Sequence, residues 1–350
     1  MRSVPRHVTS PAPRAVWQEV LKADAQALVF QTPAWLDCIC ALGGYEDASR
    51  LYETPGGRLL VLPLVRRTGL PEALTTQASL PLGWGIGGLV ASGPLEAEDV
   101  VAVFADLAGR AVLRTSLRPN PLDAEVWTAA QPPGVIAVPR LAHILDLAGG
   151  FERVWAKRFA SETRTAVRKA ERSGLVVQCD TSGQLVPVFD DLFRLSIDRW
   201  ARQQHEPRPL ARWRGRWRDP LRKFQLVAQA LGAACRLWVA WHDGRPAAAI
   251  LVLQGANASY TRGVMDKELA GPTQANVLLH RLAIEEACRV GCRSYHMGES
   301  GPSASLAQFK RRFGATPYRY AEYRLERLPL TSVDAHLRGL VKRFIGFKDA

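Results

Sequence analysis

The last third of the sequence has the most informative alternation of apolar and polar positions. A short β-patterned segment, SYTRGVM (259–265), precedes a Gly-Pro pair and a stretch from about Thr273 to Val290 with the spacing of an amphipathic helix. A second short strand, RSYHMG (293–298), follows Gly291. This order predicts a right-handed βαβ unit whose strand ends form a cleft. We expect the helix N-terminus near Thr273 to present unpaired N–H groups towards that cleft.

Neighbouring segments extend this unit into a larger α/β domain. A helix carrying FKRRF (309–313) is followed by Gly314 and an aromatic-rich strand, PYRYAEYRL (317–325). A hairpin is predicted over 235–254, because Asp243-Gly244 is a strong two-residue turn signal between two apolar runs. Three helices are expected before the hairpin, with a Pro/Arg loop at 206–212 between the last two: Phe151–Ser173, Leu185–Gln204 and Arg212–Leu231.

The first half of the sequence predicts a separate mixed α/β domain. Helical spacing from Trp17 to Leu42 is interrupted at Thr32-Pro33, a pair typical of an N-cap and a first helical residue. The glycine-rich stretch 83–93 lacks the spacing of a dinucleotide-binding loop and predicts a strand and turn. With a length of 350 residues, the pattern predicts two domains, residues 1–150 and residues 151–350. Further elements are expected as strands at 49–54, 58–67, 111–119 and 135–147 and as a helix at 99–109.

The chain is strongly basic, and the excess is concentrated in one region. It has 46 Lys and Arg against 33 Asp and Glu, a formal net charge of +13. Residues 153–223 hold 17 basic and 8 acidic side chains, which is +9 of that total. Such an excess favours anionic partners such as nucleic acid, phosphorylated substrates or an anionic membrane surface. A basic amphipathic helix at 330–347 is expected to dock on the domain, with contact to an anionic membrane surface as the alternative.

Two classes of protein are disfavoured by the pattern. The longest apolar run, around Leu59 to Val65, is far shorter than the roughly 20 residues of a membrane span. The first 14 residues have no apolar core, so we expect no secretory signal and a cytoplasmic protein. None of the six cysteines forms a CxxC pair, which predicts free thiols in a reducing compartment. We expect no metal site, although Cys288, Cys292 and His280 share one helix.

Several local patterns resemble known acyltransferases. The element order of the second half resembles the GNAT acyltransferase fold. The segment SETRTAVRKAERSGLVV (161–177) and the tail from Tyr260-x-x-Gly263 through LAQFKRRFGA (306–315) look like a Fem-type (FemAB-like) aminoacyltransferase. FQTPAWLDCI (30–39) is similar to the start of that family and of BioF2-like acetyltransferases. The resemblance covers nearly the whole chain and implies an α/β fold with two tandem GNAT-like domains.

The resemblance also implies a reaction and two residues that serve it. Fem-type enzymes transfer an amino acid from aminoacyl-tRNA to the amine of a peptidoglycan precursor, so it implies an enzyme of cell-wall synthesis that performs N-acyl transfer. The lysine of the family's F-K pair matches Lys310, with Phe309 beside it. A tyrosine of the central strand matches Tyr260. On physical grounds, an ammonium held near the cleft stabilises a developing oxyanion, whereas a solvated lysine in a K-R-R run is the structural alternative.

Other candidates come from the residue types around the cleft. Arg262 is expected on the same strand face as Tyr260, with Thr261 opposite, and would bind substrate. Glu299 is the candidate catalytic base, and Asp266 and His296 are alternatives to it. A structural histidine is the simpler interpretation of His296.

Convergent arginines at helical spacing are expected to bind the phosphates of an anionic acceptor. These candidate substrate-binding residues are Arg164 and Arg168 on one helix and Arg212 and Arg216 on another. A solvated helix face is the alternative for each of them.

The donor is the least determined part of the prediction. GNAT enzymes that use coenzyme A carry a glycine-rich Q/R-x-x-G-x-G/A loop before the central helix, whereas this chain has KELAGPT (267–273). Since Pro272 removes an N–H donor, the sequence disfavours acetyl-CoA and favours a bulkier acyl group delivered on tRNA or on a carrier protein, with aminoacyl-tRNA as the expected donor. Acyl-CoA or acyl carrier protein remains the alternative donor, and a non-catalytic basic binding protein is the third hypothesis. We expect no cofactor other than the donor as co-substrate.

Overall fold

The computed structural model describes residues 7–301, 303–344 and 347, and the chain divides into two compact units. The first unit comprises residues 1–141 and 318–336, and the second comprises residues 142–317 and 337–350. The predicted boundary near residue 150 lies close to the first crossing point. The return of residues 318–336 to the first unit was not predicted, and it occurs because the long strand β15, Thr316–Glu326, pairs with β8 of that unit.

Among the described residues, the first unit contains two groups of paired strands, the helices α1 to α4 and the start of the helix α13 (Leu330–Phe344). One four-stranded sheet is antiparallel and has the order β1-β3-β4-β7. The other strands follow the order β15-β8-β6-β5-β2, in which β6 and β8 are parallel. The bounds are β1 His7–Thr9, β2 Tyr45–Asp47, β3 Arg50–Glu53, β4 Leu59–Leu62, β5 Val65–Arg67, β6 Thr76–Ala78, β7 Val90–Ala91, β8 Arg114–Leu117, α1 Arg14–Ala23, α2 Pro33–Leu42, α3 Ala97–Ala108 and α4 Ala124–Ala129.

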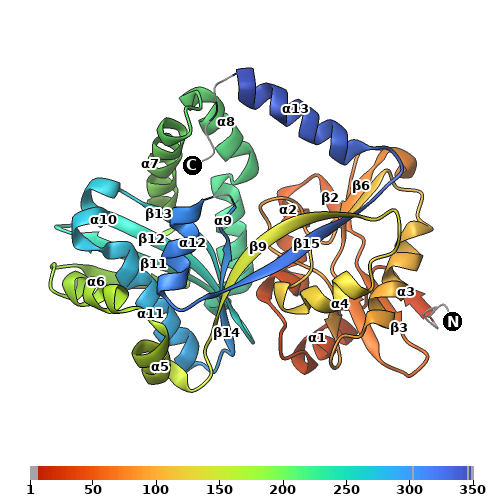
Figure 1. The fold of residues 1–350 in the computed structure, drawn as a ribbon, viewed down its shortest axis with the longest axis horizontal. Coiled ribbons are helices and arrows are strands. Elements are labelled where there is room, and N and C mark those ends of the chain that lie inside the picture. Colours follow the sequence, from red (N-terminus) through yellow and green to blue (C-terminus); the bar gives the residue numbers. More distant parts are fainter. Residues whose placement is uncertain (1–6, 302, 345–346, 348–350) are drawn as a thin grey trace. The chain divides into compact units, whose positions relative to one another are not determined.

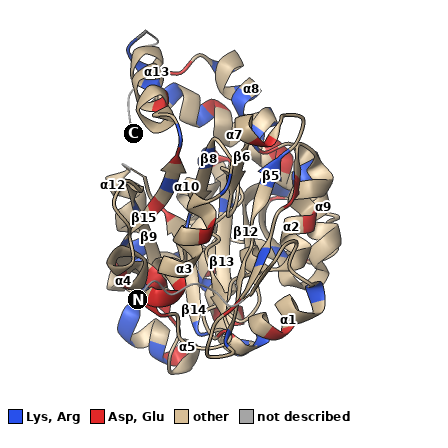
Figure 2. Ribbon diagram, turned by 90° about the vertical axis from the view of Figure 1, so that its right-hand side faces the viewer, with Lys and Arg blue, Asp and Glu red and all other residues tan. Residues whose placement is uncertain are grey.

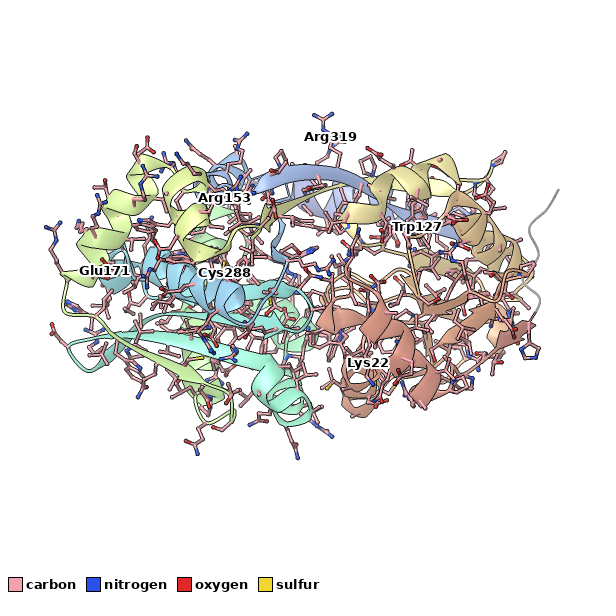
Figure 3. The ribbon with its side chains drawn as sticks, turned by 90° about the horizontal axis from the view of Figure 1, so that it is seen from below. Lys22, Trp127, Arg153, Glu171, Cys288 and Arg319 are labelled. Atoms are coloured by element: carbon pink, nitrogen blue, oxygen red, sulfur yellow. The ribbon has the colours of Figure 1, made fainter. Side chains whose placement is uncertain are left out.

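An aromatic cluster explains why β15 belongs to the first unit. Trp127, labelled in Figure 3, stacks on Tyr323 with ring centroids 5.6 Å apart. Phe104 contacts both rings edge to face, at 5.6 and 5.7 Å. Each of the three side chains is at most 1% exposed, so β15 supplies a central part of this core.

The second unit is built on a mixed sheet with the order β10-β11-β12-β13-β14-β9. The predicted hairpin is confirmed: β11 and β12 are antiparallel, and Asp243 and Gly244 at their turn have φ angles of 49° and 73°. The predicted βαβ unit is confirmed as well, because β13 and β14 pair in parallel on either side of α11. The strand bounds are β9 Ile136–Asp146, β10 Val176–Asp180, β11 Cys235–His242, β12 Arg245–Gln254, β13 Ala258–Met265 and β14 Ser294–Glu299.

Helices cover both faces of this sheet (Figure 1). The helices α11 and α7 both pack against β12 and β13. In addition, α11 contacts α5 and α6, and α7 contacts α8 and α9. The large core on the α11 side includes Ile250, Leu279 and Ile284, all completely buried. The helix bounds are α5 Gly150–Arg153, α6 Ser161–Glu171, α7 Val186–Gln203, α8 Arg208–Arg218, α9 Leu221–Leu231, α10 Lys267–Thr273, α11 Ala275–Arg289, α12 Ala304–Arg312 and α13 Leu330–Phe344.

Two predicted helices are each divided in the structure. The helix expected over 151–173 is interrupted at Phe159-Ala160, where the amide of Ala160 donates to the carbonyl of Arg312 instead of continuing a helical ladder. The helix expected over 212–231 is two helices separated at Asp219-Pro220. The Pro/Arg segment expected as a loop forms the start of α8, because a proline in the first helical turn removes no intrahelical hydrogen bond.

The terminal helix α13, which the sequence predicts to dock on the domain, exposes its apolar side chains. Its Val333, Leu337, Leu340 and Val341 are between 49% and 55% exposed. In the part of the chain that the structure describes, no helix has the length and apolar character needed to cross a bilayer.

Candidate active site

The sheet of the second unit opens between its two parallel strands. Only two residue pairs join β13 to β14, Ala258 with Tyr295 and Ser259 with His296. Beyond them β13 continues to Met265 and β14 to Glu299, and a cavity of about 930 Å³ lies at this opening. Residues of β13, β14, α12, α7 and α8 line it. The cavity therefore lies where the βαβ pattern predicts a cleft.

Lys310 brings its ammonium group to this cavity. Its helix, α12, begins at an N-cap serine, whose hydroxyl accepts from the amide of Leu306. The side chain of Lys310 turns inward, so that the residue is only 1% exposed. Its Nζ donates to the carbonyl oxygens of Gly298, at 2.9 Å, and Glu299, at 2.8 Å, at the end of β14. Lys310 is therefore not the solvated lysine of the structural alternative.

The environment of Lys310 alters its proton affinity. Burial lowers the pKa of Lys310 to about 7, against the opposing effect of the Glu299 carboxylate. Since carbonyl dipoles carry only partial charge, they do not offset the cost of removing an ammonium from water. At neutral pH the group is therefore close to the midpoint of its titration.

A β-bulge at Thr261 separates the two candidates on β13. Tyr260 is paired with Val252 and Arg262 with Leu251, which leaves Thr261 as the extra residue, its Oγ1 donating to the carbonyl of Leu251 at 3.0 Å. Their partners Val252 and Leu251 are consecutive residues of β12 and therefore point to opposite faces of the sheet. Tyr260 and Arg262 consequently point to opposite faces as well. The prediction that they share a face is wrong, because an inserted residue interrupts the alternation of side chains between the two faces of a strand.

The contacts of Tyr260 follow from this geometry. Its ring packs edge to face on His280 of α11, with centroids 4.6 Å apart. Burial raises the pKa of Tyr260 to about 12, so its hydroxyl stays protonated at neutral pH. Burial and the nearby Lys310 lower the pKa of His280 to about 3, which keeps that imidazole neutral. Tyr260 is thus a hydrogen-bond donor that also lines the cavity.

On the other face, Arg262 belongs to a buried ion cluster. Its Nη2 lies 2.7 Å from the Asp219 carboxylate, which also binds Lys223 at 2.7 Å and Arg218 at 2.9 Å. Burial alone would raise the pKa of Asp219, but the three cations outweigh it and hold that pKa at about 2. The guanidinium of Arg262 also lies over the ring of Phe193, 5.4 Å from its centroid. Arg262 lines the cavity from this fixed position.

Two further predicted residues lie in the same cavity. Glu299 lines it at the end of β14, beside the ammonium of Lys310. Phe309 lines it from α12 and packs on His280 and Phe313, with ring centroids 5.4 and 5.2 Å away. The structure thus brings Lys310, Tyr260, Glu299, Phe309 and Arg262 to one cavity.

The four other predicted arginines are not among the residues that line this cavity. Arg212 forms an ion pair with Asp198 through both its Nε, at 2.8 Å, and its Nη2, at 2.5 Å. Arg164 donates to the carbonyl oxygen of Phe159, at the helix break. Arg168 and Arg216 are exposed. Their predicted role in phosphate binding would therefore concern parts of a substrate outside the cavity.

The alternative bases are less well placed. Asp266 accepts from the amide of Glu268 at 3.0 Å and caps α10. His296 is 3% exposed, and its two ring nitrogens have no hydrogen-bond partner among the described residues. Because burial lowers the pKa of His296 to about 3, it is a weak base.

Sequence reasoning missed three polar residues near the reacting region. Arg199 of α7 lines the cavity, and its Nη1 donates to the carbonyl of Met265 at 2.9 Å. Ser300 lines it as well, with its Oγ 3.1 Å from Nδ1 of the buried His143. His143 comes from β9, so no local motif connects it with the GES segment at 298–300.

The segment before α11 differs from the predicted loop. Residues 267–273 form the short helix α10, and α11 begins only after Gln274, whose φ is 57°. Thr273 Oγ1 donates to the carbonyl of Leu269 at 2.6 Å, and Gln274 Nε2 donates to that of Gly271 at 2.7 Å. Both bonds satisfy carbonyl oxygens of α10, which ends one residue after Pro272. The prediction of a Gly-Pro loop is therefore wrong, whereas the helix expected from about Thr273 to Val290 is α11, which begins two residues later, at Ala275.

Comparisons with known proteins identify the type of domain that holds this cavity. Residues 157–318 match the family profile described as "Acetyltransferase (GNAT) domain". The fold is similar to the crystal structure of FemX, with 13% identity, 93% of this chain and 99% of that chain covered, and a TM-score of 0.67. A conserved protein of unknown function from Bacteroides thetaiotaomicron is also similar, with 11% identity, 89% and 97% coverage and a TM-score of 0.51. No curated protein sequence matches the chain. The predicted fold is confirmed.

Proposed function

Residues 157–318 form a GNAT acyltransferase domain, and from this premise we propose that the cavity between β13 and β14 transfers an acyl group to an amine. The observation that carries the proposal is the position of Lys310. Two hydrogen bonds fix its Nζ at the cavity wall, and an ammonium has three N–H donors. The third donor is available to the oxygen of a reacting carbonyl.

The proposed reaction assigns one task to each residue. The neutral acceptor amine attacks the carbonyl carbon of an ester or thioester, and the carbonyl oxygen becomes negatively charged beside Lys310. Glu299 accepts the proton that the amine loses. The bond to the donor's leaving oxygen or sulfur then breaks, and this atom takes up the proton held by Glu299 while Tyr260 donates a hydrogen bond to it. A C–N bond replaces the C–O or C–S bond.

We propose aminoacyl-tRNA as the donor, in a Fem-type reaction on a peptidoglycan precursor. Two observations support this choice over coenzyme A. The glycine-rich phosphate loop of coenzyme A enzymes is replaced by α10, and the overall fold is similar to FemX. Four arginines of the cavity wall would suit an anionic phosphorylated acceptor: Arg199, Arg214, Arg218 and Arg262.

An acyl-CoA or acyl carrier protein donor is the second candidate, since the matching domain family is described as an acetyltransferase. A parallel assay separates the candidates. The purified full chain is incubated with an amine acceptor and either charged tRNA, acyl-CoA or acyl carrier protein, and the products are identified by mass spectrometry. Transfer that RNase abolishes supports the tRNA donor, whereas stoichiometric release of free coenzyme A supports the second candidate.

A matched pair of variants tests the catalytic role independently of the donor. Lys310→Met should abolish most of the transfer, whereas Lys22→Met changes an exposed lysine of α1, 72% exposed at its side chain, and should retain it. If no donor gives transfer, and Lys310→Met weakens tRNA binding no more than Lys22→Met does, the chain is a non-catalytic basic binding protein.

A further inference from the structure

Helix α13 is largely exposed, and its apolar side chains form a stripe along one side. Residues 335–343 are all exposed. Val333, Leu337, Leu340 and Val341 are 49%, 55%, 49% and 54% exposed, respectively. A helix of this length is marginally stable by itself in water, and an apolar face left in solvent adds no packing energy. A surface of this kind is typical of a segment that binds something else.

The stripe has a defined width and charged borders. At about 100° per residue, the four apolar side chains fall within an arc of roughly 100°. Arg338 lies beside one edge of this arc, and Arg343 and His336 lie beside the other. Figure 2 shows basic residues on α13. The acidic Asp334 is already paired, 2.8 Å from Arg114.

The start of α13 is anchored without using this stripe. The amide and hydroxyl of Thr331 donate to the Glu326 carboxylate at 3.0 and 2.6 Å. Arg324 donates to the same hydroxyl at 2.9 Å. These bonds and the ion pair of Asp334 all lie within the first unit. The first turn is therefore held by polar contacts while the apolar side chains remain unused.

We propose that α13 binds the surface of an anionic lipid bilayer and lies in the plane of the interface. An apolar arc bordered by cations matches a bilayer, because the aliphatic side chains enter the acyl boundary and the cations meet anionic headgroups. At 15 residues, the helix is about 22 Å long and too short for a hydrocarbon core of about 30 Å. Nucleic acid fits less well, since the stripe offers aliphatic side chains where base stacking needs aromatic ones.

Vesicle co-sedimentation of the full chain tests this proposal. The wild type should bind vesicles of phosphatidylcholine and phosphatidylglycerol and should bind pure phosphatidylcholine much more weakly. Leu337→Gln with Leu340→Gln should weaken binding to the anionic vesicles roughly tenfold or more, because each leucine loses its transfer into the acyl region. Arg338→Gln with Arg343→Gln should weaken it by a similar factor and reduce its salt dependence. Leu328→Gln, at an apolar residue that is 56% exposed but precedes the helix, is the matched control and should bind as the wild type does.

Hydrogen exchange shows whether the stripe is available. Amides at 335–343 should exchange fast in lipid-free solution and slowly with anionic vesicles. Slow exchange without lipid would mean that the chain itself covers the stripe, and a dimer that the leucine variant dissociates would mean that a second copy does. Either result overturns the proposal, as does wild-type binding that is equal on both vesicles or unaffected by the leucine variant. Binding to single-stranded RNA that depends on Arg338 and Arg343 but not on the leucines, without vesicle binding, would assign the surface to nucleic acid.

Discussion

Lys223 and Lys310 are two buried lysines of the same unit, and their partners differ. Lys223 is 4% exposed and donates to the Asp219 carboxylate within a cluster of three cations. Lys310 is 1% exposed and donates to two backbone carbonyls at the edge of a cavity. Burial lowers the pKa of both, and a carboxylate opposes the shift in each case, Asp219 for Lys223 and Glu299 for Lys310. Because the Asp219 carboxylate neutralises the charge of Lys223, we infer a structural role for Lys223. The backbone carbonyls that accept from Lys310 carry only partial charge, so its ammonium remains available to a developing negative charge.

Removing the Asp219 carboxylate should have the largest effect, and this effect is on the stability of the fold. Asp219→Ala leaves Lys223, Arg262 and Arg218 buried without their carboxylate, and the free energy of unfolding should fall by about 3–5 kcal/mol. Urea denaturation followed by tryptophan fluorescence measures this loss. Glu19→Gln, at an exposed ion pair with Lys22, should leave the midpoint unchanged. A similarly small loss for Asp219→Ala would show that the cluster is not structural.

Replacing the other lysine should affect catalysis and leave folding largely intact. Lys310→Met removes the ammonium beside the reacting carbonyl, and the transfer rate should fall about 10²–10³-fold, which corresponds to about 3–4 kcal/mol. Single-turnover kinetics measure the change, and urea denaturation should show a much smaller loss of stability than Asp219→Ala. If the variant unfolds instead, the distinction between the two lysines fails.

The pH dependence of stability sharpens the same distinction. The pKa of Lys310 is lowered from 10.5 to about 7 in the folded protein, so between these values the unfolded chain binds more protons at this site. The free energy of unfolding of the wild type, relative to Lys310→Met, should therefore rise with pH across this window, by at most about 1.4 kcal/mol per pH unit. Denaturation at pH 6, 8 and 9.5 would detect it, and a flat difference would contradict the pKa shift.

Removing one hydroxyl at the cavity should have a smaller effect. Tyr260→Phe keeps the ring contact with His280 but deletes the donor, and the transfer rate should fall roughly tenfold, as expected for the loss of one hydrogen bond. The pH profile should keep its shape, because Tyr260 stays protonated in the wild type below its pKa of about 12. An unchanged rate would exclude Tyr260 as the leaving-group donor.

The smallest effect is expected for an arginine outside the cavity. Arg212→Gln breaks an exposed ion pair with Asp198, and such pairs contribute little to stability. The urea midpoint and the KM for the acceptor should both stay unchanged. A raised KM would show that the acceptor extends beyond the cavity to the exposed face of α8 that carries Arg212, as the sequence predicts.

The sequence predicted elements whose signal is local. The hairpin at Asp243-Gly244 and the βαβ unit follow from turn residues and apolar spacing, and both are confirmed. The division at Phe159-Ala160 was missed because it depends on a hydrogen bond from Ala160 to residue 312, far along the chain. The return of β15 to the first unit depends in the same way on tertiary packing around Trp127.

The candidate site was predictable to a different extent. Lys310 was named through its F-K motif, and its position in a cavity with Tyr260 is consistent with that hypothesis. Its burial was not predictable, since a K-R-R run on a helix is typical of a solvated face. His143 and Arg199 come from distant elements, and no spacing in the sequence relates them to the F-K motif.

The bulge at Thr261 has a consequence for how substrate preference can change. Because one inserted residue turns Tyr260 and Arg262 to opposite sides of the sheet, a single strand serves two chemically different surfaces. Substitutions around Arg262 can alter what is recognised on one surface while the other keeps its geometry. Because Val252 and Leu251 are consecutive, deleting Thr261 would remove the bulge and still leave Tyr260 and Arg262 on opposite sides, so the pairing with β12 rather than the length of β13 maintains the two surfaces.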